Sequence, residues 1–329
     1  MTPNSSLIPA TVAMDAARLQ AAVDHVTARL PHVRSLLVAR CGQLVLEQYW
    51  NCTSADPQDF QSVTKSLLGA MCGGIFNNLQ GTVLDFFPEF SADVIDLRWR
   101  HVTIRHLLTM TAGLQSELTH PAYDDAWFSA DDPVKFALTQ KLVADPGATF
   151  HYSNASTHLL GEVLARATGE RLDTALRSRL LDPIGAELHA WPTDKVGRPF
   201  GSGYVHLTPL HALRFGQLVL QRGMWNGMSV VDGAWLQASI QPQVRAYEWM
   251  EGIAWYGYLW WVTREAGLEA WYATGWGGQY IAVFPQVQLV VVMTGETVDH
   301  PNHRYVIREL VLPAVGHDLT ETQVAPGSF

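Results

Sequence analysis

Cysteine, lysine and long apolar runs are all scarce in this chain of 329 residues. Its three cysteines form no C-x-x-C pair, which argues against a disulfide scaffold and against a zinc knuckle. No run of about 18 apolar residues occurs, so no segment is expected to span a membrane. The Walker and Rossmann glycine patterns and the G-x-S-x-G motif are missing too. We therefore expect no cofactor, no metal and no α/β-hydrolase fold.

Positive charge is also in short supply. Lys and Arg number 22 against 31 Asp and Glu, which gives a net charge of -9. Because no basic block is available to neutralise phosphates, a nucleic-acid partner is not expected. Residues Met1–Leu19 hold neither a charged segment nor an apolar stretch of signal-peptide length. We therefore expect a cytoplasmic protein, unless a leader has been trimmed.

Material for a hydrophobic core is plentiful. Apolar residues make up 48% of the chain and charged residues 16%, which excludes a disordered protein. A single core stops growing near about 250–300 residues. The length therefore predicts two lobes, which we assign to one domain over residues 1–329.

The predicted elements change character along the chain. Apolar spacing predicts a helix over Asp15–Leu30, and two β-prone runs around Cys41–Gln43 predict a hairpin. Helical patterns fill most of the middle of the chain. Strand-like runs and a closing helix follow, at 255–262, 269–274, 279–284, 289–294 and 303–312. This order predicts an α+β fold, in which both chain ends (about 1–58 and 225–329) form one sheet and a mostly helical lobe (about 59–224) is inserted.

The first candidate for chemistry is Ser62, which begins an S-x-x-K sequence ending at Lys65. One helical turn places the hydroxyl and the amine on one face, so the amine can accept the hydroxyl proton. Lys65 is the only charged residue between Asp59 and Asp85, within an apolar segment of the kind that is buried. Burial lowers the pKa of a lysine and makes it a usable base near neutral pH. The alternative is a surface lysine at the tip of a helix.

The second candidate is the pair Tyr152 and Asn154, between a Pro-Gly turn and a predicted helix. A phenol near a cation can relay a proton, and an amide on the same loop can hold a substrate carbonyl. The alternative is a loop tyrosine followed by a capping asparagine.

The third candidate is the glycine-rich run Thr274–Gln279, T-G-W-G-G-Q, between two predicted strands. Glycines within strands mark a close approach of the backbone to a ligand or to another segment. A backbone N–H here and that of Ser62 could together form an oxyanion hole. The alternative is a simple hairpin turn.

The order S-x-x-K, Y-x-N and glycine-rich strand resembles that of the serine β-lactamase and penicillin-binding-protein superfamily. Two longer segments are similar to its class C branch: V-T-I-R-H-L-L-T-M-T-A-G-L at 102–114 and P-G-A-T-F-H-Y-S-N at 146–154. The resemblance covers roughly residues 15–315. It implies a β-lactamase/transpeptidase-like fold, with an antiparallel sheet flanked by helices.

The resemblance also implies roles for individual residues. Ser62 would be the nucleophile, Lys65 its base, and Tyr152 the residue that passes a proton to the leaving group. The N–H groups of Ser62 and Trp276 would form the oxyanion hole. Four residues would bind the substrate: Asn154, Thr274, Gly275 and Trp276.

The chain departs from the family pattern at Ala273, where a Lys or His usually precedes Thr-Gly. That cation helps β-lactamases and peptidases hold the substrate carboxylate, so its loss argues against β-lactam hydrolysis and D-Ala-D-Ala cleavage. The G-W-G-G-Q run instead resembles the branch of 6-aminohexanoate-dimer hydrolases and family VIII esterases.

Together these features predict a serine hydrolase that cleaves small esters or amides through an acyl-enzyme. One alternative is an amidase, peptidase or β-lactamase acting on D-amino-acid, aminohexanoate or β-lactam amides, and a second is a non-catalytic penicillin-binding-like protein. The expected partner is a small-molecule substrate, with no nucleic acid or membrane. Six of the 12 tryptophans lie between Trp249 and Trp276, where they could line an acyl pocket or pack the core of the sheet.

Overall fold

The structure, a computed structural model, describes residues 12–247, 255–299 and 303–319. Most of the N-terminal stretch that we searched for a leader lies outside these residues. An antiparallel eight-stranded sheet dominates the fold, in the order β2-β1-β12-β11-β10-β9-β8-β7. Its strands are β1 (Val33–Arg40), β2 (Gln43–Tyr49), β7 (Val244–Arg245), β8 (Trp255–Tyr256), β9 (Trp261–Glu265), β10 (Leu268–Gly275), β11 (Gln279–Phe284) and β12 (Leu289–Gly295). Both ends of the chain thus contribute to one sheet, as expected.

The expected N-terminal helix and hairpin are present. Helix α1 (Ala16–Arg29) is capped by the Asp15 carboxylate and buries a stripe of apolar residues. β1 and β2 are joined through Cys41 and Gly42, which both have positive φ values, 51° and 78°. A two-residue turn of this kind matches the twist of the strands it connects.

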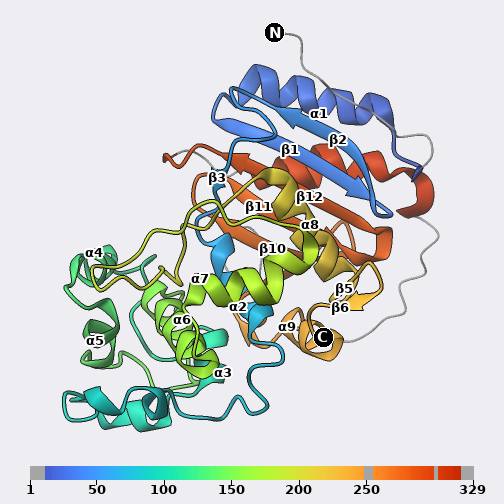
Figure 1. The fold of residues 1–329 in the computed structure, drawn as a ribbon. Coiled ribbons are helices and arrows are strands. Elements are labelled where there is room, and N and C mark those ends of the chain that lie inside the picture. Colours follow the sequence, from blue (N-terminus) through green and yellow to red (C-terminus); the bar gives the residue numbers. More distant parts are fainter. Residues whose placement is uncertain (1–11, 248–254, 300–302, 320–329) are drawn as a thin grey trace.

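A group of helices lies to one side of the sheet (Figure 1). It contains α3 (Ile104–Leu108), α4 (Pro121–Ser129), α5 (Pro133–Leu138), α6 (Asn154–Thr168) and α7 (Leu172–Leu176). Local sequence signals set their ends. Thr103 caps α3, and α6 runs from a Ser153 cap to Gly169, whose φ is 70°.

Helix α2 (Val63–Met71) is buried along its whole length and contacts both the sheet, through β10, and the helical lobe, through α6. Helix α8 (Pro209–Leu220) packs on β11 and β12. A Cβ atom on its Gly216 would lie 2.6 Å from a methyl carbon of Val290. In the sequence, residues 209–220 fall within the predicted helical lobe (about 59–224). The packing of α8 shows that it belongs with the sheet instead.

Short elements complete the described chain. A further helix is α9 (Gly233–Ser239), and two small sheets pair β3 (Gln58–Asp59) with β4 (His206–Leu207) and β5 (Met224–Trp225) with β6 (Met228–Ser229). The short helical turns are η2 (Val83–Phe86), η3 (Pro88–Phe90), η4 (Leu97–His101), η5 (Arg177–Leu181), η6 (Asp182–Ile184), η7 (Pro285–Val287), η8 (Val306–Val311) and η9 (Leu312–Leu319). None of the helices in the described ranges is both long and apolar enough to cross a membrane.

One predicted strand is wrong. The run 255–262 is not a single strand but two, β8 and β9, which pair with each other across a tight turn. Leu259 in that turn has a φ of 62°, and its N–H donates to the backbone oxygen of Leu108. The β-prone residues of this run gave no sign of the turn, because a left-handed leucine is set by tertiary contacts and not by propensity.

Candidate functional site

Ser62 stands at the N-terminus of α2, after a residue with an uncommon backbone. Gln61 has a φ of 47°, and its side chain and N–H both donate to the carboxylate of Asp59. Non-glycine residues with positive φ are costly and tend to persist at functional sites. The Ser62 side chain makes no cap hydrogen bond to the helix, so it is available for other contacts.

Lys65 is 1% exposed and lies one turn further along α2. Its ammonium nitrogen Nζ is 2.8 Å from Ser62 Oγ, 2.7 Å from Asn154 Oδ1 and 2.6 Å from the backbone oxygen of Ser202. The structure thus brings the S-x-x-K pair and the asparagine of Y-x-N together around one nitrogen. The surface-lysine alternative is wrong, because the side chain is buried.

The charges around Lys65 have opposing effects on its pKa. Burial lowers the pKa of Lys65 to about 8, while the carboxylates of Glu117 and Asp124 act to raise it. Burial in turn raises the pKa of Glu117, and the nearby Lys65 charge acts to lower it. The amine is therefore much easier to deprotonate than an ordinary lysine, whose pKa is about 10.4.

Tyr152 lies just before α6 and is buried. Lys65 Nζ is 4.9 Å from the centre of its ring, which also stacks on the indole of Trp261 at 5.4 Å. Burial raises the pKa of Tyr152 well above its usual range, although a hydrogen bond with the Ser62 side chain acts to lower it. Tyr152 is therefore a neutral phenol beside the serine.

Asn154 is held from two sides by acidic residues that the sequence analysis missed. Its side-chain Nδ2 donates to both oxygens of Asp124, each at 3.2 Å, and its backbone N–H donates to Glu117 at 2.9 Å. These bonds turn the amide oxygen of Asn154 towards Lys65. Neither acidic residue belongs to a recognisable motif, so no sequence signal pointed to them.

The glycine-rich run forms the turn between β10 and β11. Gly275 lies close to the residues that precede Ser62: a Cβ atom on it would be 2.5 Å from the backbone oxygen of Phe60. Gln279, fully buried, donates its amide to the backbone oxygens of Gly277 at 3.0 Å and of Gly295 at 2.8 Å. Gln279 belongs to the glycine-rich run, but its sequence position alone does not indicate that it holds the turn.

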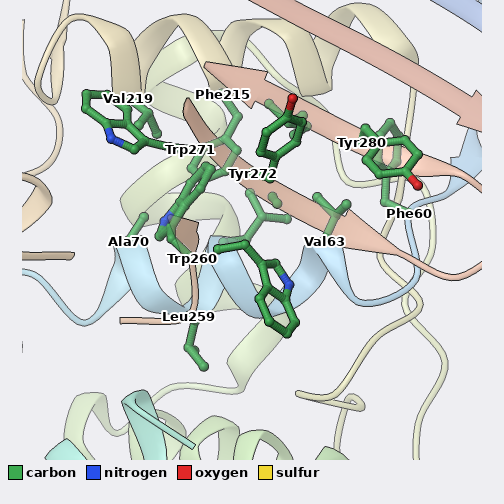
Figure 2. Packing of buried hydrophobic residues seen from close by; sticks show 14 of the residues in the cluster. Phe60, Val63, Ala70, Phe215, Val219, Leu259, Trp260, Trp271, Tyr272 and Tyr280 are labelled. Carbon is green, nitrogen blue, oxygen red and sulfur yellow. The ribbon is translucent and has the colours of Figure 1, made fainter. Parts of the chain in front are cut away.

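The described tryptophans between 249 and 276 differ in burial. Trp260 and Trp271 are buried against α2 and α8, within the apolar cluster shown in Figure 2. Trp261 packs on Tyr152, whereas Trp276 is 54% exposed. Trp249 lies outside the described residues. Most of the described tryptophans in this segment therefore pack in the core, Trp255 is partly buried, and Trp276 presents an exposed indole.

A comparison with known protein families identifies the family of this chain. The model of the Beta-lactamase family matches residues 23–312. The chain belongs to the beta-lactamase family. It is thus a member of a family of serine hydrolases, and the expected family and fold class are confirmed.

Two curated relatives and one solved structure are similar to this family member. The 6-aminohexanoate-dimer hydrolase of Paenarthrobacter ureafaciens is 26% identical over 321 residues, which cover 86% of this chain and 79% of that protein. Esterase EstB of Burkholderia gladioli is 28% identical over 211 residues, 55% of this chain and 54% of that esterase. A family VIII carboxylesterase has the same fold, with a TM-score of 0.72, 15% identity, and coverage of 91% of this chain and 97% of that protein.

In this member of the beta-lactamase family, the residue directly before the glycine-rich run, Ala273, is uncharged. The alanine side chain has no charge and no hydrogen-bond donor, so it offers a substrate carboxylate no partner. Among the arginines of the sheet, Arg245 lies in β7 at its edge, and β9 and β8 separate that strand from β10. Within the described ranges, no group of three or more His, Cys, Asp or Glu residues could hold a metal ion.

Proposed function

We propose that this protein is a serine hydrolase that cleaves small esters or amides through an acyl-enzyme on Ser62. One observation carries the proposal: Lys65 Nζ has three partners at 2.6–2.8 Å, and two of them are carbonyl oxygens. The carbonyl oxygens of Asn154 and Ser202 can only accept hydrogen bonds.

These two acceptors fix the direction of the remaining bond. A neutral amine has two hydrogens and one lone pair, and the two carbonyl oxygens take both hydrogens. As an ammonium, Lys65 donates to all three partners, Ser62 Oγ included. Once the amine is neutral, its lone pair points at Ser62, and the hydroxyl donates its hydrogen to the amine. This is the arrangement that a general base requires before it removes the proton of a nucleophile.

The chemical steps follow from this geometry. Lys65 takes the Ser62 proton while Oγ forms a bond to the substrate carbonyl carbon. The carbonyl oxygen gains the negative charge, and we assign its stabilisation to the N–H groups of Ser62 and Trp276, each worth about 3 kcal/mol. The close approach of Gly275 to Phe60 supports this assignment, since it brings the end of β10 next to the start of α2.

Tyr152 is proposed to complete proton transfer. Its phenol donates a proton to the leaving alcohol or amine and recovers one from the Lys65 ammonium, which restores the neutral amine. The raised pKa of Tyr152 supports a phenol that donates rather than a phenolate that attacks. Water then attacks the acyl-enzyme and releases the acid and free Ser62.

The surroundings of the site favour substrates without a carboxylate. Ala273 supplies no cation, and Glu117 and Asp124 place negative charge beside Lys65. The names of the two curated relatives, a 6-aminohexanoate-dimer hydrolase and an esterase, agree with an ester or a linear amide as substrate. A non-catalytic role fits poorly, because a buried lysine directed at a serine has no use in a binding module.

The test is a substrate panel on the wild type and Ser62→Ala, with short-chain p-nitrophenyl esters, nitrocefin and a linear aminohexanoate dimer. A fluorophosphonate probe is used in parallel, and peptide mass spectrometry locates it. We expect ester hydrolysis and labelling of Ser62, both lost in Ser62→Ala with the fold intact. Labelling of another serine, or full activity of Ser62→Ala, would falsify the proposal.

A further inference from the structure

A histidine and an aspartate outside the proposed catalytic residues form a buried pair in the helical lobe. His158 Nε2 on α6 lies 3.2 Å from Asp194 Oδ2, and the two side chains are 1% and 0% exposed. Asp194 also accepts the backbone N–H groups of Val196 and Arg198. Burial acts to raise the pKa of Asp194, but the bonds from His158 and Arg198 outweigh it and hold the pKa at about 2.

The second nitrogen of His158 holds the backbone of a separate segment. The N–H of Gly201 donates to His158 Nδ1 at 3.3 Å. Because an N–H needs a lone pair as its acceptor, Nδ1 carries no hydrogen, and the hydrogen of the neutral ring sits on Nε2 and is donated to Asp194. The carboxylate thereby fixes the tautomer that can hold Gly201.

Gly201 is followed by Ser202, whose backbone oxygen accepts a hydrogen bond from Lys65. The segment has little freedom on the α6 side: a Cβ atom on Gly201 would be 2.5 Å from the backbone oxygen of Thr157. The hydrogen bonds that link Asp194, His158 and Gly201 thus end one residue before Ser202. The backbone oxygen of Ser202 helps to orient the Lys65 amine.

We propose that His158 and Asp194 are positioning residues, which hold the Ser202 carbonyl on Lys65 and so direct the lone pair of the amine at Ser62. The inference rests on the proposed function. It extends that function by a pair that touches neither Ser62 nor the reacting atoms.

A purely structural pair would have a different effect from a positioning pair. If the pair only stabilised the lobe, its loss would lower the melting temperature and leave the folded enzyme unchanged. If the pair positions the Ser202 carbonyl, its loss leaves one hydrogen of Lys65 without that acceptor. The lone pair of the neutral amine is then less well directed at Ser62. The ammonium form of Lys65 also loses the Ser202 oxygen, which stabilises it. The remaining charges on Lys65, from Glu117 and Asp124, and the neighbouring phenol of Tyr152 stay in place.

The experiment compares His158→Phe and Asp194→Asn with the wild type. Phe keeps the ring that packs against Trp127 and Phe200 but removes both nitrogens. Ser35→Ala is the matched control, because it breaks a buried 2.6 Å hydrogen bond to Thr294 in the sheet, outside the helical lobe that holds His158 and Asp194. Each variant is assayed on a p-nitrophenyl ester across pH, well below its melting temperature, with competent sites counted by fluorophosphonate titration.

We expect kcat per competent site to fall about ten- to hundredfold in His158→Phe and less in Asp194→Asn, with KM little changed. The acid limb of the pH profile should move to lower pH in His158→Phe, because the ammonium form of Lys65 has lost a hydrogen-bond acceptor. Ser35→Ala should lower the melting temperature and leave both kcat and the limb where they were.

Two outcomes would overturn the inference. In the first outcome, His158→Phe keeps the wild-type kcat and the wild-type acid limb of the pH profile. In the second, its loss of activity is fully explained by the fraction of active sites that the fluorophosphonate probe does not label. Either result, obtained with the probe still on Ser62, rejects the positioning role and leaves the proposed function standing. If Ser62 itself is not labelled in the wild type, the proposed function fails first. Should His158→Phe not fold, Asp194→Asn gives the same test.

Discussion

A Cβ atom on Gly275 would lie 2.5 Å from the backbone oxygen of Phe60, a distance that no folded chain accommodates without movement. The glycine therefore allows the end of β10 to touch the turn that leads into α2. This contact joins the two backbone segments from which we derive the oxyanion hole.

Gly275→Ala should separate these segments and lower kcat/KM for an ester on the order of a hundredfold, since small displacements of a catalytic group are that costly. Steady-state kinetics and a melting curve measure the effect. Gly81→Ala is the control, because a Cβ atom there would meet its nearest neighbours at 3.7 Å and 3.8 Å, which is ordinary contact. If Gly275→Ala has the kinetics of the wild type, the Trp276 N–H is not part of the oxyanion hole.

Lys65→Arg should be nearly as inactive as Lys65→Ala. Guanidinium keeps the positive charge but does not give up its proton in proteins, so it cannot accept the proton of Ser62. Ester hydrolysis by both variants, compared after active-site titration, checks this expectation. A Lys65→Arg enzyme with substantial activity would show that the residue supplies charge alone.

The pH profile should depend on Glu117. Activity requires neutral Lys65, so it rises with pH through the pKa of that amine, near pH 8. Glu117 acts to raise this pKa, and Glu117→Gln should therefore move the acid limb to lower pH; Asp124→Asn should move it in the same direction. Profiles of kcat/KM for a neutral ester measure the shift. Glu187→Gln is the control, because it removes an exposed carboxylate and should leave the acid limb of the pH profile unchanged. An acid limb that does not move in Glu117→Gln would contradict the effect of Glu117 on the pKa of Lys65.

Ala273 should set the preference between esters and β-lactams. A charge-assisted hydrogen bond to a substrate carboxylate is worth about 1.5–3 kcal/mol, or roughly a tenfold to hundredfold change. We expect the wild type to hydrolyse simple esters far better than nitrocefin. Ala273→Lys should narrow the gap by improving nitrocefin, with ester kinetics as the internal control. Comparable wild-type turnover of both substrates would count against the argument.

Sequence reasoning located the parts of the site that depend on local spacing. The S-x-x-K pair works through one helical turn, and the cap at Ser153 and the stop at Gly169 are local signals that place α6. Such features depend on a few neighbouring residues, and the structure brings Lys65 into contact with Ser62 as the S-x-x-K spacing predicted.

The parts that were missed depend on tertiary placement. Ser202 contributes a backbone oxygen, which every residue possesses, so its identity carries no signal. Glu117 and Asp124 act because the fold buries them beside Lys65, and a carboxylate in a loop or a short helix looks the same whether or not that happens. The turn at Leu259 was missed for a similar reason, since its positive φ is stabilised by a partner more than 100 residues away, Leu108.

The pairing of β1 with β12 has a consequence for the order of synthesis. Val33 pairs with Gly295, so β1 leaves the ribosome long before its partner strand exists. At about 5–20 residues per second, the delay is on the order of 15 to 50 seconds. Throughout that time β1, whose residues are nearly all buried in the finished protein, has only β2 beside it. The newly made N-terminal hairpin therefore presents an apolar surface and an open strand edge, both of which favour aggregation until β12 is made.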